Sequence, residues 1–258
     1  MPNVKCIPKG TIATMIERRF RVMLSAFLAF SVLLASGLST ALSGRHYIDV
    51  SPVFVLALML LPLLVRRNPF EFYGLTWGKF RRVSGWQMLG VTLALVLVVQ
   101  SMMFLFARDL TEFAAQHPSK VPGVMSRDIV ASFSPWLAIL LSFFQTAAGT
   151  FLEEAGFRGL LQKALSWPRF LRRLNPWLAI VVQAVLFGAV HAAMLSGSSA
   201  PLGVATWIFL YPTVAGLVLG YVCYRYNSIL PAWYIHWGSN FLAAILAALG
   251  FDLFLIIR

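Results

Sequence analysis

The chain is built from long runs of apolar residues that are separated by short polar segments. A helix needs about 20 mainly apolar residues to cross the hydrocarbon core of a bilayer. Seven runs approach or exceed that length: 22–43, 48–65, 86–107, 136–157, 176–195, 203–223 and 229–257. The pattern therefore predicts an all-α, polytopic membrane helix bundle with about seven to eight transmembrane helices.

Two of these runs have uncertain ends, and one polar stretch between runs is unusually long. The fourth run is expected to continue as a helix toward Trp167, because Pro168 is the residue that stops it. The last run is long enough to tilt or to break near Gly250. The stretch 108–135 contains His117-Pro118 and Pro122-Gly123 and is predicted to be a loop on the outer side.

Composition supports one membrane domain over residues 1–258 rather than a set of soluble domains. Hydrophobic residues make up 59% of the chain and charged residues 12%, whereas soluble domains are about half apolar and a quarter charged. The net charge is +12. Because the basic residues lie in clusters between apolar runs, we expect a lipid bilayer as partner and no nucleic acid. The two cysteines, Cys6 and Cys223, predict neither a disulfide framework nor a zinc finger.

Basic residues also predict the orientation of the chain. With the N-terminus in the cytoplasm, 16 of the 21 Lys and Arg residues fall on the cytoplasmic side, as the positive-inside rule requires. Residues 1–21 then form a basic cytoplasmic tail. A basic tail before an apolar run also fits a signal peptide with a cleavage site near 39–41. The length of the first run favours a retained helix.

Four ionisable residues lie within or at the ends of predicted spans on three different helices. They are Glu153 and Glu154, His191 and His236. An ionisable group in hydrocarbon is costly and indicates a functional site. If these groups face one another inside the bundle, they can share protons, a water molecule or a metal ion. Their convergence is the main prediction about function.

Helical spacing assigns different positions to these groups. Consecutive glutamates lie about 100° apart on an α-helix. Arg158 lies four residues after Glu154 and is expected to pair with it, which leaves Glu153 as the freer carboxylate. Asn240 is expected on the face of His236, and Phe187 on the face of His191, where it shapes the pocket.

The set is suited to amide hydrolysis by an activated water molecule. Glu153 and His191 can hold and deprotonate water, as general bases do. His236 and Asn240 can donate hydrogen bonds to the developing oxyanion. Glu154 and Arg158 would brace the helix.

Three short patterns carry a resemblance to a known family. They are Glu-Glu-x-x-x-Arg at 153–158, Phe-x-x-x-His at 187–191 and His-x-x-x-Asn at 236–240. In this order on successive apolar segments, they resemble the CPBP family, which comprises the CAAX prenyl endopeptidases of the Ras-converting type and their bacterial relatives. The resemblance covers about 130–245, which is expected to be the catalytic core.

The resemblance implies an intramembrane protease with an all-helical bundle and a cavity open to the cytoplasm and the bilayer. Glu153 and His191 would activate water, and His236 and Asn240 would stabilise the oxyanion. Glu154 and Arg158 would support them. The substrate would be a membrane-anchored or lipid-modified peptide or protein. No cofactor is required. The compact length and the form of the motifs favour a bacterial cytoplasmic membrane.

Three other functions fit part of the pattern. A zinc-dependent protease would bind the metal through Glu153, His191 and His236, although no His-Glu-x-x-His helix is present. A non-catalytic scaffold or bacteriocin self-immunity protein would use the same groups as buried polar contacts. A proton-coupled transporter would use them as a relay, but the chain lacks two halves with matching broken helices.

Overall fold

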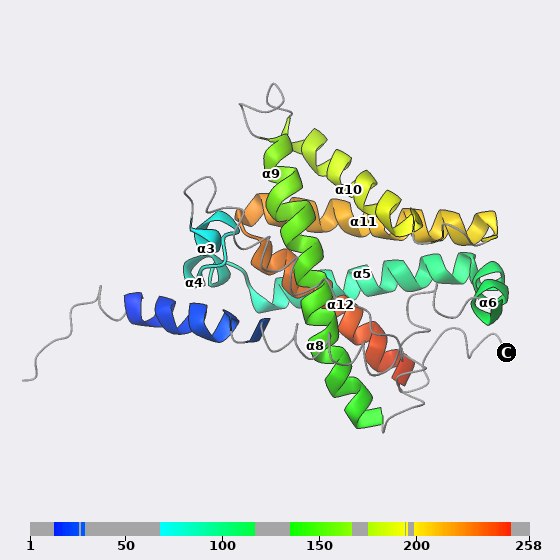
Figure 1. The fold of residues 1–258 in the computed structure, drawn as a ribbon, viewed down its shortest axis with the longest axis horizontal. Helices are drawn as coiled ribbons and strands as arrows, with labels where there is room; N and C mark the ends of the chain where they lie inside the picture. The colour runs from blue at the N-terminus through cyan, green and yellow to red at the C-terminus, as the bar shows by residue number, and fades with distance from the viewer. Residues whose placement is uncertain are drawn as a thin grey trace, which may run out of the picture.

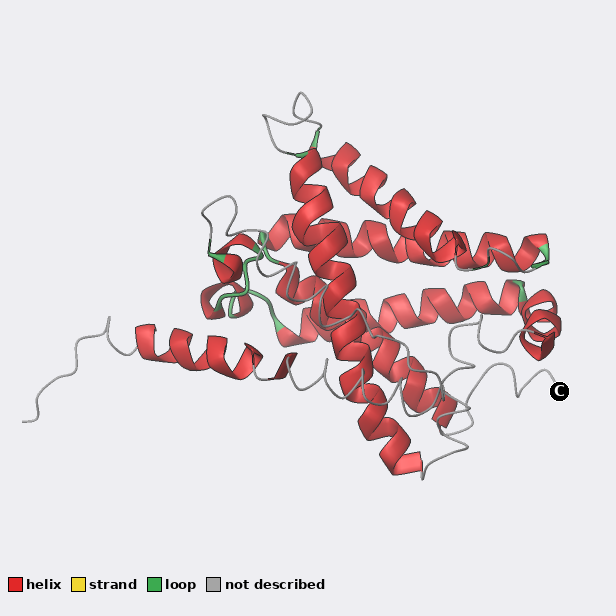
Figure 2. Cartoon of the chain, viewed as in Figure 1, coloured by secondary structure: helices red, strands yellow, loops and turns green. Residues whose placement is uncertain are grey.

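The fold is an all-α membrane helix bundle, as the apolar pattern predicts. The computed structural model describes residues 13–25, 27–28, 68–116, 135–166, 175–193, 195 and 199–248. These residues form helices joined by short turns, and no strand occurs among them (Figure 2). The predicted fold class is confirmed.

Five of the predicted spans coincide with long helices. They are α5 (Gly85–Leu105), α8 (Pro135–Glu153), α10 (Pro176–Ala193), α11 (Leu202–Tyr226) and α12 (Ile229–Ala248). By length and composition, α5, α10 and α11 could each cross a membrane. The predicted spans 22–43 and 48–65 lie mostly outside the described residues, as do the cleavage site near 39–41 and the break near Gly250.

The fourth predicted span continues beyond Glu153 as one helical rod. The π-helix η2 (Glu154–Leu161) follows α8 directly, and α9 (Gln162–Leu165) follows η2. The long helix expected toward Trp167 is therefore observed as far as Leu165. The π-helical hydrogen bonding, in which the N–H of Gln162 donates to the carbonyl of Phe157, was not predicted.

The predicted outer loop at 108–135 is partly wrong. Its first residues belong to the helix α6 (Ala107–Gln116). Leu110 and Phe113 on one face of α6 are buried against Val204, Trp207 and Ile208 of α11. This face stabilises a short helix in a segment whose prolines, further along the chain, indicated a loop. Residues 117–134 lie outside the described part.

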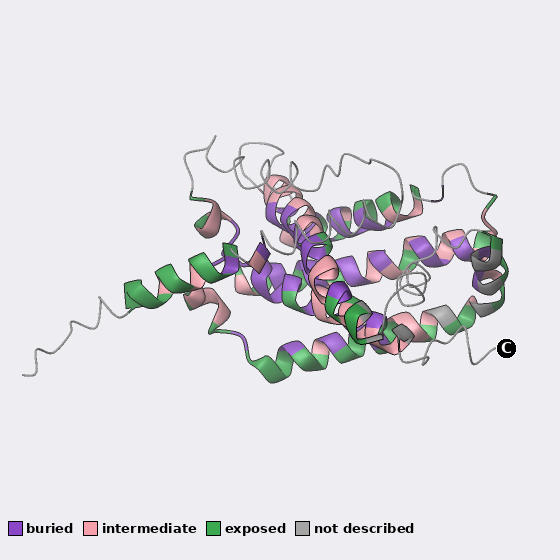
Figure 3. Ribbon diagram, turned by 60° about the horizontal axis from the view of Figure 1, so that its bottom comes forward, coloured by how far each residue is buried: buried purple, intermediate pink, exposed green. Residues whose placement is uncertain are grey.

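Helix α12 lies at the centre of the bundle. It packs against α5, α8, α11 and η2, while α10 packs mainly against α11 (Figure 1). Buried and exposed residues alternate along these helices (Figure 3). On α5 the outer face carries Trp86, Leu89, Leu93 and Leu97, a row of apolar groups suited to lipid.

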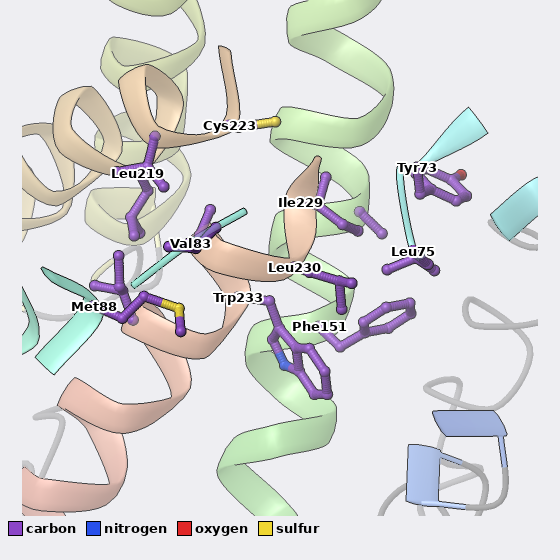
Figure 4. Packing of buried hydrophobic residues seen from close by; sticks show 14 of the residues in the cluster. Tyr73, Leu75, Val83, Met88, Phe151, Leu219, Cys223, Ile229, Leu230 and Trp233 are labelled. Atoms are coloured by element: carbon purple, nitrogen blue, oxygen red, sulfur yellow. The ribbon is translucent and has the colours of Figure 1, made fainter. Parts of the chain in front are cut away.

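The segment between residues 68 and 83 closes one end of the bundle. It contains the short helices α3 (Pro69–Phe72) and α4 (Trp77–Phe80). Tyr73 and Leu75 are fully buried and enter the same apolar cluster as Phe151, Ile229 and Leu230 (Figure 4). The segment thus joins α8 to the turn between α11 and α12.

Backbone hydrogen bonds hold this segment on the turn. Asn227 ends α11 in the left-handed conformation at φ 48°. The next hydroxyl, on Ser228, donates to the carbonyl of Gly74 over 2.7 Å, and the N–H of Ile229 donates to the carbonyl of Tyr73 over 3.0 Å. Gly74 itself has φ +69°, a conformation that glycine adopts without steric cost.

The same segment contacts the helix that carries the glutamate pair. The ring of Tyr73 lies so close to Gly159 that an added methyl group would be 2.5 Å from it. The ammonium of Lys163 donates to the carbonyl of Phe72 and lies 4.7 Å from the centre of its ring. Burial lowers the pKa of Lys163 and raises the pKa of the Tyr73 hydroxyl. Both groups therefore act as packing elements.

The helical segment 13–25 docks on α4 through one carboxylate. Glu17 accepts hydrogen bonds from Arg21 over 2.9 Å and from the N–H of Trp77 over 3.0 Å. The ring of Phe20 packs on Trp77 and Phe80. Because the first turn of a helix has unpaired N–H groups, Glu17 supplies the cap that Thr76 does not provide.

We predict that Gly74→Ala destabilises the bundle by about 1–3 kcal/mol. A methyl group at Gly74 would lie 2.6 Å from the carbonyl oxygen of Asn227 and 2.7 Å from Cα of Ser228, at a φ that disfavours alanine. Thermal unfolding in detergent measures the change. The matched control is Gly78→Ala, whose methyl group meets no atom within 4 Å. Equal melting temperatures for the two variants would contradict the prediction.

Candidate active site

The predicted site residues come from three helices that converge in the bundle. Glu153 ends α8 and Glu154 begins η2. His191 lies in the last turn of α10, and His236 lies in the first half of α12. The structure brings both glutamates onto His236, and His191 joins the group through the ring of Phe187.

Glu154 is the fully buried member of the glutamate pair. Its Oε1 lies 2.8 Å from Nδ1 of His236 and 3.0 Å from Nη1 of Arg158. The side chains of Glu154 and Arg158 are both 0% exposed. The predicted ion pair between them is therefore present. Charges buried to this degree need partners of opposite sign and hydrogen bonds, and Glu154 has a cation on one side and an imidazole on the other.

Glu153 occupies a different environment although it is the adjacent residue. Its side chain is 35% exposed, and its Oε2 lies 3.6 Å from Nε2 of His236. It is the freer carboxylate, as spacing predicts. The two glutamates thus face opposite nitrogens of one imidazole. The sequence analysis had placed Glu153 beside His191 instead.

The π-helical turns provide the local backbone for this arrangement. A π-helix bonds each N–H to the carbonyl five residues earlier, so its turns are wider than those of an α-helix. Such turns occur frequently at functional sites. Here they begin at Glu154 and include two glycines, Gly156 and Gly159, which are poor α-helix formers. The wider turns still keep Arg158 next to Glu154.

His191 contacts the site indirectly. Its Nδ1 lies 2.8 Å from the carbonyl oxygen of Phe187, and because a carbonyl only accepts, this nitrogen carries a proton. The neutral ring then has an unprotonated Nε2. The ring of Phe187 lies 4.4 Å from that of His191 and 6.0 Å from that of His236. Among the contacts of the described residues, none joins His191 directly to Glu153.

Asn240 lies one turn after His236 on α12, as the spacing predicts. It is exposed, and no hydrogen bond within the described part of the chain engages its amide. Its amide is therefore free to meet a molecule that enters the site from outside. The predicted pairing of Asn240 with His236 around an oxyanion stays a prediction.

Two tryptophans fix the position of the helix that carries His236. The indole N–H groups of Trp233 and Trp237 donate to the carbonyls of Ala147 and Phe143 on α8, over 3.0 Å and 2.9 Å. The two rings stack at 5.8 Å. Since Trp233 and Trp237 are one turn apart, the two bonds set both the rotation and the height of α12 against the glutamate helix. Sequence analysis did not assign this role to them.

A second set of residues, around Arg158, was also not predicted from the sequence. The ring of Phe187 lies 4.2 Å from the guanidinium carbon, a cation–π contact that gives Phe187 a part beyond shaping a pocket. Gln183, one turn before Phe187 on α10, is fully buried. The sequence offered one signal for this role. Gln183 is a polar residue in an apolar run, and a buried amide requires hydrogen-bond partners.

A zinc site is not formed by the predicted ligands in this arrangement. No group of three His, Cys, Asp or Glu side chains within the described residues is close enough to hold a metal ion. Glu153 and His236 are near neighbours, and His191 stands apart from them behind Phe187.

The segment that contains this site matches a known protein family. Residues 134–242 match the sequence model of the Rce1-like family, described as type II CAAX prenyl endopeptidase Rce1-like. This segment, less than half of the chain, is therefore similar to the type II CAAX prenyl endopeptidases. No curated protein and no solved structure matches the chain.

The CAAX endopeptidase segment begins with α8 and ends within α12. It coincides closely with the core predicted at 130–245 and contains every predicted site residue. The chain is accordingly a membrane protein, and its residues 134–242 match a family of proteases. Helices α3 to α6 and the segment 13–25 lie before the matched region, and they contribute to the bundle from outside it.

We predict that Glu154→Gln destabilises the protein by about 3–5 kcal/mol, because it leaves Arg158 as an uncompensated buried charge. Glu153→Gln, at the exposed position, should change the free energy of unfolding by less than about 1 kcal/mol. Thermal unfolding in detergent compares the two. Adding Arg158→Met to Glu154→Gln should recover part of the loss, since no unpaired charge then remains. A larger loss for Glu153→Gln than for Glu154→Gln would refute this assignment.

Proposed function

We propose that the chain is an intramembrane endopeptidase that hydrolyses a peptide bond of a membrane-associated protein or peptide by means of a water molecule activated by Glu153. One observation carries the proposal. Two adjacent carboxylates flank His236. One is fully buried and paired with Arg158, and the other is 35% exposed and has no cationic partner among the described residues other than His236. The family to which residues 134–242 belong supports the reaction class.

Glu153 is the general base in this proposal. Its side chain is 35% exposed, which lets water reach it, and its buried Oε2, which faces His236, accepts no hydrogen bond from the described residues. His191 takes part through its Nε2, which is unprotonated when Nδ1 donates to Phe187. A positioned base of this kind contributes about 10²–10⁴-fold to rate.

His236 and Asn240 stabilise the oxyanion that forms when water attacks the carbonyl. Glu154 holds Nδ1 of His236, so Nε2 is the nitrogen that faces the exposed side of the site. When His236 is protonated, the two carboxylates, the guanidinium and the imidazolium together carry no net charge. The ring can then donate from Nε2 at no electrostatic cost to the buried pair. Asn240 adds a neutral donor from the exposed surface of α12.

The substrate in this proposal is membrane-anchored or lipid-modified. The name of the matching family, a CAAX prenyl endopeptidase, supports that class, and prenylation at a C-terminal Cys-aliphatic-aliphatic-X sequence anchors a protein to the bilayer. We place the enzyme in a bacterial cytoplasmic membrane with its N-terminus in the cytoplasm, because 16 of 21 basic residues then lie on the cytoplasmic side.

We predict that Glu153→Gln removes a peptide terminus that wild-type cells produce. Membrane-protein termini are compared by mass spectrometry in cells with equal amounts of the two proteins, and the yield at that terminus should fall at least about 10²-fold. The matched control is Glu112→Gln, which neutralises a glutamate on α6 whose side chain is 61% exposed. Identical termini in all three strains, with the biological effect intact in the mutant, would replace the protease by a scaffold or immunity protein.

We further predict that cleavage of that terminus persists in purified membranes treated with 1,10-phenanthroline. A water activated by carboxylate and imidazole needs no metal ion, whereas a zinc protease loses its nucleophile when the metal is removed. A known zinc protease added to the same membranes shows that the chelator works. Loss of cleavage with the chelator and its return with added Zn²⁺ would favour the zinc-dependent alternative.

A further inference from the structure

Helices α10 and α11 lie close together next to Arg158. A methyl group placed on Gly216 of α11 would lie 3.0 Å from both Cα and Cβ of Ala184 on α10. The same methyl group would lie 3.4 Å from Nη2 of Arg158, at ordinary contact distance. The backbone of Gly216 therefore lies beside the guanidinium, and a side chain at this position would press on Ala184 of α10.

The guanidinium of Arg158 is positioned by the backbone of Gly216 and by the ring of Phe187. Phe187 lies 4.2 Å from the guanidinium carbon, and Glu154 is its ion-pair partner at 3.0 Å. Its N–H groups meet no hydrogen-bond acceptor of ideal geometry in the described part of the chain. Since few directional bonds orient Arg158, the shape of its surroundings determines where its charge lies.

A buried amide side chain holds the backbone of Gly216 in place. The Nε2 of Gln183 donates to the carbonyl oxygen of Gly216 over 2.8 Å, and Gln183 is fully buried. One turn further along α11, Gln162 donates to the carbonyl of Gly220 over 3.0 Å. Backbone carbonyls of α11 are thus held from α10 and from the helix that carries the glutamates. Small residues let helices approach closely in membranes, and such amides then join them.

We propose that Gly216, held by Gln183, is a positioning residue for the active site. It keeps the Arg158 guanidinium against Glu154, and Glu154 in turn orients the imidazole of His236 through Nδ1. Gly216 touches no reacting group, so its effect passes through the buried ion pair. This inference rests on the proposed function of the same site. It adds a residue from α11, a helix that none of the three sequence patterns includes.

A methyl group at Gly216 would meet Ala184 at 3.0 Å, which is closer than ordinary contact, and Arg158 at 3.4 Å, which is ordinary contact. The overlap with Ala184 would move α10 and α11 apart by a few tenths of an ångström. Because α10 carries the ring of Phe187 that covers the guanidinium, this movement changes the packing of Arg158 against Glu154. A change of orientation at His236 should then follow without loss of the fold, because the overlap with Ala184 is small.

The test follows His236 directly. The full chain is labelled with ¹⁵N-histidine and placed in vesicles of phosphatidylcholine and phosphatidylglycerol, where solid-state NMR resolves its four histidines. His236 is assigned by the signal lost in His236→Gln. Gly216→Ala should shift the Nδ1 signal of His236, and Ala184→Gly added to it should return part of that shift, because it removes Cβ of Ala184 but not Cα. Gly149→Ala is the matched control, since its methyl group meets no atom within 4 Å.

Cleavage provides the second measurement. Gly216→Ala should lower the yield at the terminus defined by Glu153→Gln about tenfold, because small misplacements of catalytic groups have large kinetic effects. Gly149→Ala should leave it unchanged. If no such terminus exists, the proposed function fails while the NMR comparison still decides the inference. If the terminus exists and Gly216→Ala changes neither its yield nor the His236 signal, only the inference is overturned.

A second variant tests the proposal if Gly216→Ala does not fold. Gln183→Met keeps the side-chain length and removes the hydrogen bond to Gly216. It should shift the same Nδ1 signal in a protein that still melts cooperatively. A lowered melting temperature with an unmoved His236 signal would show that Gln183 and Gly216 serve packing alone, and would overturn the proposal.

Discussion

The carboxylate of Glu154 has no contact with solvent and is shared between Arg158 and His236. An ionised carboxylate without partners in such a place would cost several kcal/mol. The helices of the core therefore have to deliver those partners. The glutamate helix supplies Arg158, α12 supplies His236, and α10 supplies the aromatic face of Phe187 that covers the guanidinium. The packing of these three helices thus depends on compensating the buried charge of Glu154.

Neutralisation of Glu154 also explains how two identical neighbours can have different tasks. Glu154 is shared between Arg158 and His236 through Oε1, and its Oε2 is buried, so bulk water does not reach this carboxylate. The side chain of Glu153 is 35% exposed and faces the far nitrogen of the same imidazole. Environments that differ this strongly are the usual means by which enzymes assign separate acid and base roles to paired carboxylates. The closing segment 68–83 contacts the same helical rod beyond the site, where Tyr73 lies against Gly159 and the carbonyl of Phe72 accepts from Lys163.

Much of this arrangement could be predicted from the sequence, because burying charge in a membrane is costly enough to limit where ionisable residues occur. Apolar run length located α5, α8, α10, α11 and α12, and i,i+4 spacing gave the pair of Glu154 with Arg158. The partner of Glu153 could not be predicted in this way. A prediction from helical spacing assumes the same number of residues per turn along the whole helix. The structure changes to wider π-helical turns at Glu154. Helix α6 was missed because its buried face becomes visible only once α11 lies against it.

The change of hydrogen-bond pattern at Glu154–Leu161 has a consequence for how this region can vary. A wide turn holds one residue more than an α-helical turn. Deleting a single residue inside these turns would therefore let a regular α-helix form and would leave the two ends of the rod close to their present register. A deletion between Glu154 and Arg158 would shorten their spacing from four residues to three, which an α-helix still places on one face. A change of length by one residue can thus be absorbed here, whereas within α8 it would rotate everything that follows by about 100°.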